Sequence, residues 1–197
     1  MTKNSYHHGN LKEAIIEEAL NLLNSNIKND FSFRLISRNL GVVSSAPYNH
    51  FKDKSDLLKE LIELGINKLL KNMEKEKNKS ELPSEQLLLI AKSYLNFAIK
   101  NKALYNLMFG ENNKDLLDLT YKVVLQFEKI ISEKFKAGKR VNLTVKGSSI
   151  TAWSMMHGLA ITVNNSNVDF LEEKLNMTLE EILGEMSAIW GKGVSNL

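Results

Sequence analysis

The chain has 197 residues, of which 43% are hydrophobic and 25% charged, so a disordered or fibrous protein is excluded and one or two globular domains are predicted. It contains no cysteine, which excludes disulfide scaffolds, thiol nucleophiles and cysteine-ligated metal centres, and we expect neither a cofactor nor a metal. The formal net charge of +3 is too small to indicate a nucleic-acid partner by itself. No signal peptide or membrane-spanning stretch is evident, which predicts a cytoplasmic protein without a membrane partner.

The spacing of apolar residues predicts an all-α fold of about nine helices, because these residues recur three and four positions apart and no strand-like alternation persists. The first helix is expected over residues 10–26, since Asn10 and Glu13 fit a capping box. Ser32 is expected to cap the second helix. Gly41 is expected to stop it by taking the left-handed conformation.

A third helix and a long fourth helix are predicted after this glycine. Either Ser44 or Ser45 can cap the third helix, because Pro47 is tolerated only in a first helical turn. Asp53 then caps the fourth helix, whose apolar pattern ends near Lys77.

Two short helices joined by a glycine-containing turn and preceded by a bracing helix have the arrangement of a helix-turn-helix DNA-binding unit. Residues 32–52 also contain three basic side chains, Arg34, Arg38 and Lys52, and no acidic one. Other three-helix bundles share this spacing, so the pattern alone leaves DNA binding and simple packing both open.

The residues themselves resemble the tetracycline-repressor (TetR) family of bacterial regulators. The resemblance lies in SFRLISRNLGV at residues 32–42 and PYNHFKDKSDLL at residues 47–58, and it extends over about residues 6–70. It implies a helix-turn-helix DNA-binding domain at residues 1–54, with the motif at about 32–51. Residues 55–197 are then a helical ligand-binding and dimerisation domain.

The resemblance implies that four residues face the major groove, where short side chains permit close approach and an amide can read adenine: Ser44, Ser45, Ala46 and Asn49. Six further side chains carry donors suited to phosphate oxygens: Ser32, Arg34, Tyr48, His50, Lys52 and Lys54. Two positions depart from the family pattern. Val43 stands where a serine commonly caps the recognition helix, and Leu35 replaces the acidic half of a capping box.

The second half of the chain continues the helical pattern after a solvated connection at residues 71–81, which is rich in lysine and glutamate. Helices are expected over residues 84–100, 103–109, 114–136 and 142–164. Thr178 and Glu181 are expected to cap a final helix.

Residues 150–163 are apolar around the whole circumference of their helix, so this helix must be covered on two sides. One face can pack inside its own domain while the other meets a second copy, which predicts a homodimer. The predicted interface residues are Ala152, Met155, Met156, Leu159, Val163, Ile182, Met186, Ile189 and Trp190.

The string at residues 152–160 resembles the Trp-x-x-x-His-Gly signature of one class of TetR-type C-terminal domains. This resemblance implies an effector-binding domain, with a pocket wall that carries a large aromatic ring and an imidazole. The candidate pocket residues are Phe97, Tyr105, Met108, Phe109, Tyr121, Trp153 and His157. Core packing is the alternative for each of them, and His157 can equally serve only to hydrogen-bond a neighbouring helix.

We therefore expect a dimeric, sequence-specific transcriptional regulator, a repressor that an unknown small-molecule effector releases from a near-palindromic operator. Heavy use of lysine and asparagine with few arginines indicates an AT-rich genome and operator. No catalytic motif is present, so we do not expect an enzyme. The alternative is a helical dimeric adaptor that binds proteins and has lost DNA binding.

Overall fold

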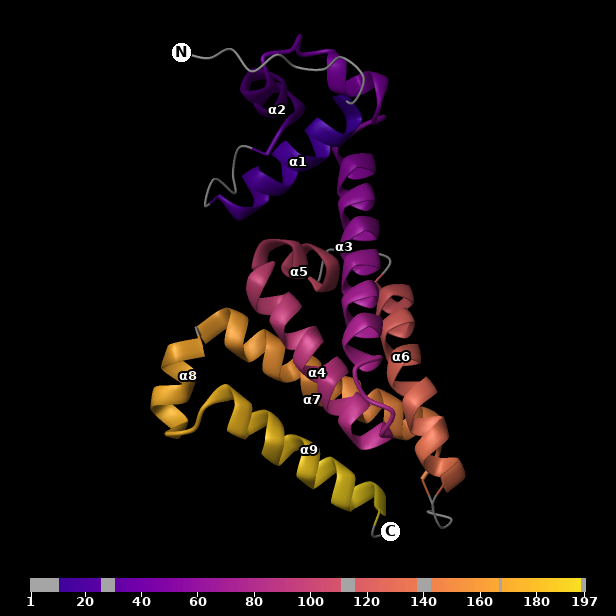
Figure 1. Cartoon of the computed structure of the whole chain (residues 1–197). Coiled ribbons are helices and arrows are strands. Elements are labelled where there is room, and N and C mark those ends of the chain that lie inside the picture. Colours follow the sequence, from indigo (N-terminus) through magenta and orange to yellow (C-terminus); the bar gives the residue numbers. More distant parts are fainter. Residues whose placement is uncertain (1–10, 26–30, 111–115, 138–142, 167, 196–197) are drawn as a thin grey trace. The chain divides into compact units, whose positions relative to one another are not determined.

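The structure is a computed structural model that describes residues 11–25, 31–110, 116–137, 143–166 and 168–195 (Figure 1). Every regular element in these ranges is a helix, so the predicted all-α class is confirmed. None of the described helices is both long and apolar enough to cross a bilayer. The chain forms two compact units, Met1–Gly65 and Ile66–Leu197, and helix α3 (Lys54–Lys77) begins in the first unit and ends in the second.

The first unit is built from α1 (Leu11–Asn24), α2 (Phe33–Leu40), a short 3-10 helix (Ala46–Asn49) and the start of α3. Helix α1 packs against α2, and α2 packs against the 3-10 helix. Buried apolar residues recur three and four positions apart along these helices, so each element contributes one stripe to a shared core. Members of this core are Ile15, Ala19, Leu22, Phe33, Ile36, Phe51, Leu57 and Leu61.

The predicted boundaries of α2 are confirmed by its capping geometry. The Ser32 hydroxyl accepts a hydrogen bond from the backbone N–H of Leu35, with 3.3 Å between the two heavy atoms. At the other end Gly41 has a φ of 69°, and its N–H bonds back to carbonyls of the last turn. Asp53 caps α3 as predicted, because its carboxylate accepts from the N–H of Asp56 at 2.9 Å. The predicted cap of α1, Asn10, lies outside the described residues.

The predicted third helix is present, with Ser45 at its N-cap position and Pro47 in its first turn, and it is a four-residue 3-10 helix at Ala46–Asn49. Its backbone bonds join residues three apart, as from the Tyr48 N–H to the Ser45 carbonyl at 3.1 Å. Ser45 makes no side-chain capping bond.

The core of the second unit is formed by α4 (Pro83–Lys100), α6 (Leu116–Ala137) and α7 (Val145–Ser166), which pack on one another (Figure 1). Helix α5 (Lys102–Phe109) packs against α4 and α6, and α8 (Val168–Leu175) packs against α7. The last helix, α9 (Leu179–Ser195), lies against α4 and α7. Helices α4, α6 and α9 therefore cover part of α7, while another face of α7, which includes Ile150 and Ile161, is exposed.

Two features of the second unit differ from the prediction. Helix α3 ends at Lys77, where its apolar pattern was predicted to end, and it therefore occupies part of the connection expected over residues 71–81. Met73 is fully buried and the Lys77–Glu74 ion pair spans one turn at 3.0 Å, so packing and charge pairing both extend the helix. Helix α8 was not predicted, because its eight residues show no long apolar period.

The predicted cap of the final helix is confirmed. The Thr178 N–H donates to the Glu181 carboxylate at 2.7 Å, and the Glu181 N–H donates to the Thr178 hydroxyl at 3.2 Å. This reciprocal pair is the capping box that the sequence predicts.

Candidate nucleic-acid interface and ligand pocket

The predicted DNA-contacting residues occupy the start of α2, the 3-10 helix and the residues that lead into α3. All but one have exposed side chains: Ser32, Arg34, Ser44, Ser45, Tyr48, Asn49, His50, Lys52 and Lys54. Ala46 is the exception, because its side chain is only 7% exposed. The structure therefore collects nine polar or basic side chains on the surface of the first unit, and Ala46 belongs to the core.

Tyr48 lies on this surface. Its ring packs edge-on against Phe33, with 4.9 Å between the ring centroids and 83° between the planes. The residue is nevertheless 61% exposed, and within the described part of the chain its hydroxyl has no hydrogen-bond partner. Together with Arg34, Ser44 and Ser45, these two rings line a groove of about 340 Å³. A fixed ring with an unused hydroxyl can donate to a phosphate oxygen without further ordering.

Two lysines near the start of α3 make different contacts: the Lys54 side chain contacts an aromatic ring, and the Lys52 backbone makes a capping bond. The Lys54 ammonium lies 5.0 Å from the centroid of the Phe31 ring, within the range of a cation–π interaction. The backbone N–H of Lys52 donates to the Asp56 carboxylate at 3.0 Å. The Lys52 side chain is exposed.

Two residues on this unit were not predicted as candidates for the interface. Lys12 of α1 places its ammonium 5.6 Å from the Phe51 ring while pairing with Glu60 at 2.9 Å. Val43 is 71% exposed directly before the serines. Its unusual exposure was not visible in the sequence, where it appeared only as a departure from the family pattern.

In the second unit, four of the predicted pocket residues meet in one cluster: Tyr105 and Phe109 from α5, with Trp153 and His157 from α7. The His157 ring stacks on Trp153 with 4.6 Å between centroids and 16° between planes. Tyr94 of α4 completes the cluster and was not predicted. A buried tyrosine needs a partner for its hydroxyl, and this requirement is the signal that could have indicated Tyr94.

Three polar atoms of the cluster lie within hydrogen-bond distance of one another. The Tyr105 hydroxyl is 2.6 Å from His157 Nδ1, the Tyr94 hydroxyl is 2.9 Å from the same nitrogen, and the two hydroxyls are 3.0 Å apart. Burial lowers the pKa of His157, and burial raises the pKa of both tyrosines. All three groups are therefore neutral near pH 7, and Nδ1 can accept from either hydroxyl.

The remaining predicted pocket residues lie apart from this cluster or inside the core. Phe97 and Met108 are 2% and 0% exposed, as expected for core packing. Tyr121 is 56% exposed and lines a separate groove between α6 and α7. Hydrogen bonding of His157 to residues of neighbouring helices is observed, as the packing alternative expects.

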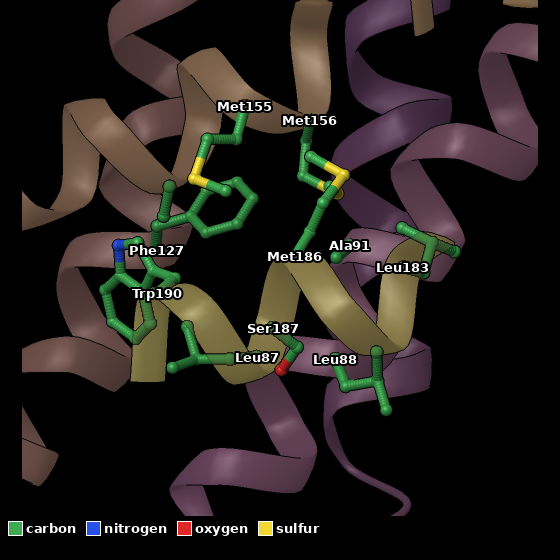
Figure 2. Close-up of a pocket in the computed structure, with 11 residues that line it drawn as sticks. Leu87, Leu88, Ala91, Phe127, Met155, Met156, Leu183, Met186, Ser187 and Trp190 are labelled. Carbon is green, nitrogen blue, oxygen red and sulfur yellow. The ribbon is translucent and has the colours of Figure 1, made fainter. Parts of the chain in front are cut away.

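A small apolar pocket of about 50 Å³ lies between α4, α6, α7 and α9 (Figure 2). In Figure 2, Met155 and Met156 project into it from α7, while Leu183, Met186 and Trp190 come from α9. Leu87 and Leu88 of α4 line the opposite side. Three of the lining side chains, Met155, Met156 and Met186, are methionines, which adapt to irregular spaces.

Several lining residues had been predicted at a dimer interface. Met156 and Val163 are only 5% and 3% exposed within a single chain, so they pack inside the unit, because α4, α6 and α9 already cover much of α7. Ile189 on α9 is 66% exposed, and Ile161 on α7 is 41% exposed. These two exposed isoleucines are available for contact with a second protein chain.

Comparison with solved structures gives many matches, and the three described here share 16–22% sequence identity with this chain. A protein of unknown function from Rhodococcus sp. RHA1 superimposes with a TM-score of 0.82 at 22% identity, covering 98% of this chain and 100% of that one. FadR from Bacillus subtilis, solved with stearoyl-CoA, gives 0.72 at 16% identity over 94% and 99%. The TetR family regulator PfmR from Thermus thermophilus gives 0.65 at 19% over 89% and 96%.

Neither the protein-family models nor the curated proteins match this sequence. The chain nevertheless has the fold of TetR-family transcriptional regulators, over nearly its whole length. In the described ranges, no group of three or more histidine, aspartate or glutamate side chains is arranged to hold a metal ion.

Proposed function

We propose that the protein is a TetR-family regulator that binds DNA as a homodimer through its first unit and is controlled by a small molecule bound in its second. The observation that carries this proposal is the surface around Tyr48, where nine exposed polar or basic side chains gather on a unit with the fold of DNA-binding regulators. Several of the solved neighbours are described as regulators, which supports a regulatory role in the cytoplasm over a catalytic one.

DNA recognition would divide between phosphate and base contacts. Arg34, Tyr48 and Lys52 carry donors for phosphates, which supply affinity but little sequence information. Ser44 and Asn49 would reach base edges in the major groove. We add Val43 to this set, because an exposed valine next to these residues can contact a thymine methyl group, in keeping with an AT-rich operator.

A homodimer would place two such surfaces on successive major grooves, about 34–36 Å apart, and so requires a near-palindromic operator. The exposed Ile161 and Ile189 support a dimer formed through α7 and α9, because exposed isoleucines on neighbouring helices are typical of an interface. Leu159, Ile182 and the outer edge of Ala152 are partly exposed and would extend it.

The effector is proposed to enter the apolar pocket between α4, α6, α7 and α9. Its lining is nearly free of polar groups, apart from the Ser187 hydroxyl and the Trp190 indole, so the part of the ligand that enters is uncharged and apolar. Stearoyl-CoA, which occupies FadR, contains such a portion. Because α3 belongs to both units, repacking of the second unit can alter the first and release DNA.

The test compares two matched double variants. Tyr48→Phe with Lys52→Gln removes a hydroxyl and a charge from the proposed interface but keeps the ring that packs on Phe33. Tyr121→Phe with Lys122→Gln makes the same chemical change at exposed positions of α6. Binding to a duplex enriched by selection is measured by fluorescence anisotropy at fixed salt.

The DNA-binding proposal expects the first variant to lose at least about tenfold in affinity, and the second to bind like the parent protein. Light scattering should find both to be folded dimers. The adaptor alternative predicts that neither variant changes, since a protein that does not use this surface for DNA loses nothing there.

A further inference from the structure

A second, polar groove of about 440 Å³ lies in the second unit, between the later part of α3 and α4. Each wall carries a row of lysine, asparagine and lysine on one helical face. Lys68, Asn72 and Lys75 form the row on α3, and Lys92, Asn96 and Lys100 form the row on α4. Residues three and four apart share a helix face, so both rows point into the same groove.

The positive charge of this groove is incompletely neutralised. The acidic residue in its lining is Glu76, which already pairs with Lys79 at 2.6 Å. The Lys68 ammonium donates to the neutral Asn101 side chain at 3.1 Å, which satisfies a hydrogen bond but cancels no charge. Among the described residues, Lys75 and Lys100 have no ion-pair partner.

Lys92 is the lysine of the groove that pairs with an acid, and its partner comes from another helix. Its ammonium lies 2.5 Å from the Glu180 carboxylate of α9, and this contact lowers the pKa of Glu180. Glu180 is largely exposed, so the ion pair is accessible to competing anions in solution.

We propose that this groove binds a small molecule that carries two or more linked phosphate groups. Lysine ammonium groups bind phosphate oxygens as point charges, and lysines on facing walls can approach a chain of phosphates from both sides. The amides of Asn72 and Asn96 offer donors and acceptors to the rest of the ligand. A volume of about 440 Å³ is within the size range of small-molecule sites, and it matches a mononucleotide better than an extended duplex.

The simplest alternative is a solvated lysine surface with no ligand. The four lysines gather positive charge around one groove, and its acidic lining residue, Glu76, already pairs with Lys79, so the mutual repulsion of the lysines is only partly offset. A bound phosphate group would remove that repulsion. It would also compete with Glu180 for Lys92, and so weaken a contact between α4 and α9.

The groove is tested by isothermal titration of the full-length protein with ADP and, in parallel, with inorganic pyrophosphate, both without divalent metal. The test variant is Lys75→Gln with Lys100→Gln. The control is Lys122→Gln with Lys129→Gln, which removes the same charge from exposed positions of α6. Glu180→Gln is the third variant, and thermal unfolding checks that each protein is folded.

The proposal predicts that the test variant binds ADP at least about tenfold more weakly, since two charge-assisted contacts are lost, while the control stays within about twofold. Glu180→Gln should bind more tightly, because Lys92 no longer has a competing carboxylate. If ADP binds more tightly than pyrophosphate, the asparagines contribute hydrogen bonds to the nucleoside part of the ligand. Equal binding supports recognition of the linked phosphates alone.

Three results would overturn the proposal. The first is an absence of binding by either probe at millimolar concentration, and the second is an equal loss in the test and control variants, which would indicate non-specific charge. The third is displacement of ADP by random duplex DNA with the same loss in the test variant, which would assign the groove to DNA. None of these bears on the Tyr48 surface, which is measured separately.

Discussion

The hydrogen-bonded cluster of Tyr94, Tyr105 and His157 leads to a specific prediction about stability. His157 is neutral near pH 7, because burial lowers its pKa, and its Nδ1 can accept from either tyrosine. Removing one hydroxyl leaves the other to donate to Nδ1. Removing both leaves this nitrogen without a donor from the described residues.

The magnitudes follow from this redundancy. Tyr94→Phe and Tyr105→Phe should each lower the free energy of unfolding by about 1 kcal/mol, the net value of one hydrogen bond. The double variant loses two such bonds and leaves an unsatisfied acceptor, which adds about 1–3 kcal/mol. We therefore expect the double variant to lose about 3–5 kcal/mol, clearly more than the sum of the single changes.

The assay is urea unfolding of the four proteins at pH 7.5 and one protein concentration, because dimer stability depends on concentration. Tyr121→Phe is the control, since this tyrosine is 56% exposed and should not change stability. If the double variant equals the sum of the singles to within about 0.5 kcal/mol, the two hydroxyls do not share one acceptor and the reasoning is wrong.

Four further changes test other parts of the structure. Ser32→Ala should lower the free energy of unfolding by about 1 kcal/mol, because the cap of α2 is lost; unchanged urea unfolding would contradict that cap. Gly41→Ala should cost about 1 kcal/mol through its φ of 69° alone, since a Cβ there meets no atom within 4 Å, and an unchanged Tm would contradict this. For His157 the pKa is lower in the folded state, so the unfolded chain binds the extra proton and stability falls as the pH drops from 6.5 through the folded pKa. His157→Gln should flatten this dependence of urea unfolding on pH, and an unaltered profile would assign it to other groups. Lys52→Gln should reduce the slope of log affinity for DNA against log salt by about 0.9, as expected for one lost phosphate contact, and an unchanged slope would remove Lys52 from the backbone contacts.

Local signals made several helix boundaries predictable. Ser32, Gly41 and Asp53 each act through residues within four positions, and the structure places their caps where the sequence indicates. The Thr178–Glu181 box is local in the same sense. Features of this kind depend on short-range hydrogen bonds that any chain with these residues can form.

Features that depend on distant contacts were less predictable. The third helix is a 3-10 helix, and no single residue of the sequence indicates that it is not an α-helix. Ala46 is buried although its neighbours are exposed. The division of α7 between core and outer surface depended on how α4, α6 and α9 cover it, so Met156 was placed at an interface although it is buried.

The candidate sites likewise divide into one that depends on local sequence and others that depend on contacts between distant residues. The polar surface of the first unit comes from one stretch of sequence, and nine of the ten residues named for it in advance are exposed. The Tyr94 contact joins residues 63 positions apart, and the two lysine rows come from separate helices. Neither arrangement could be inferred without knowing which helices pack side by side.

Sequence-specific DNA binding by the first unit is tested most directly by selecting bound duplexes from a random pool with the purified protein at a stated salt concentration. The mass of the selected complex is then measured. We expect enrichment of an AT-rich inverted repeat, with two protein chains bound to each duplex. A folded, dimeric protein that enriches no sequence even at low salt would contradict it, and the adaptor alternative would then be the better explanation.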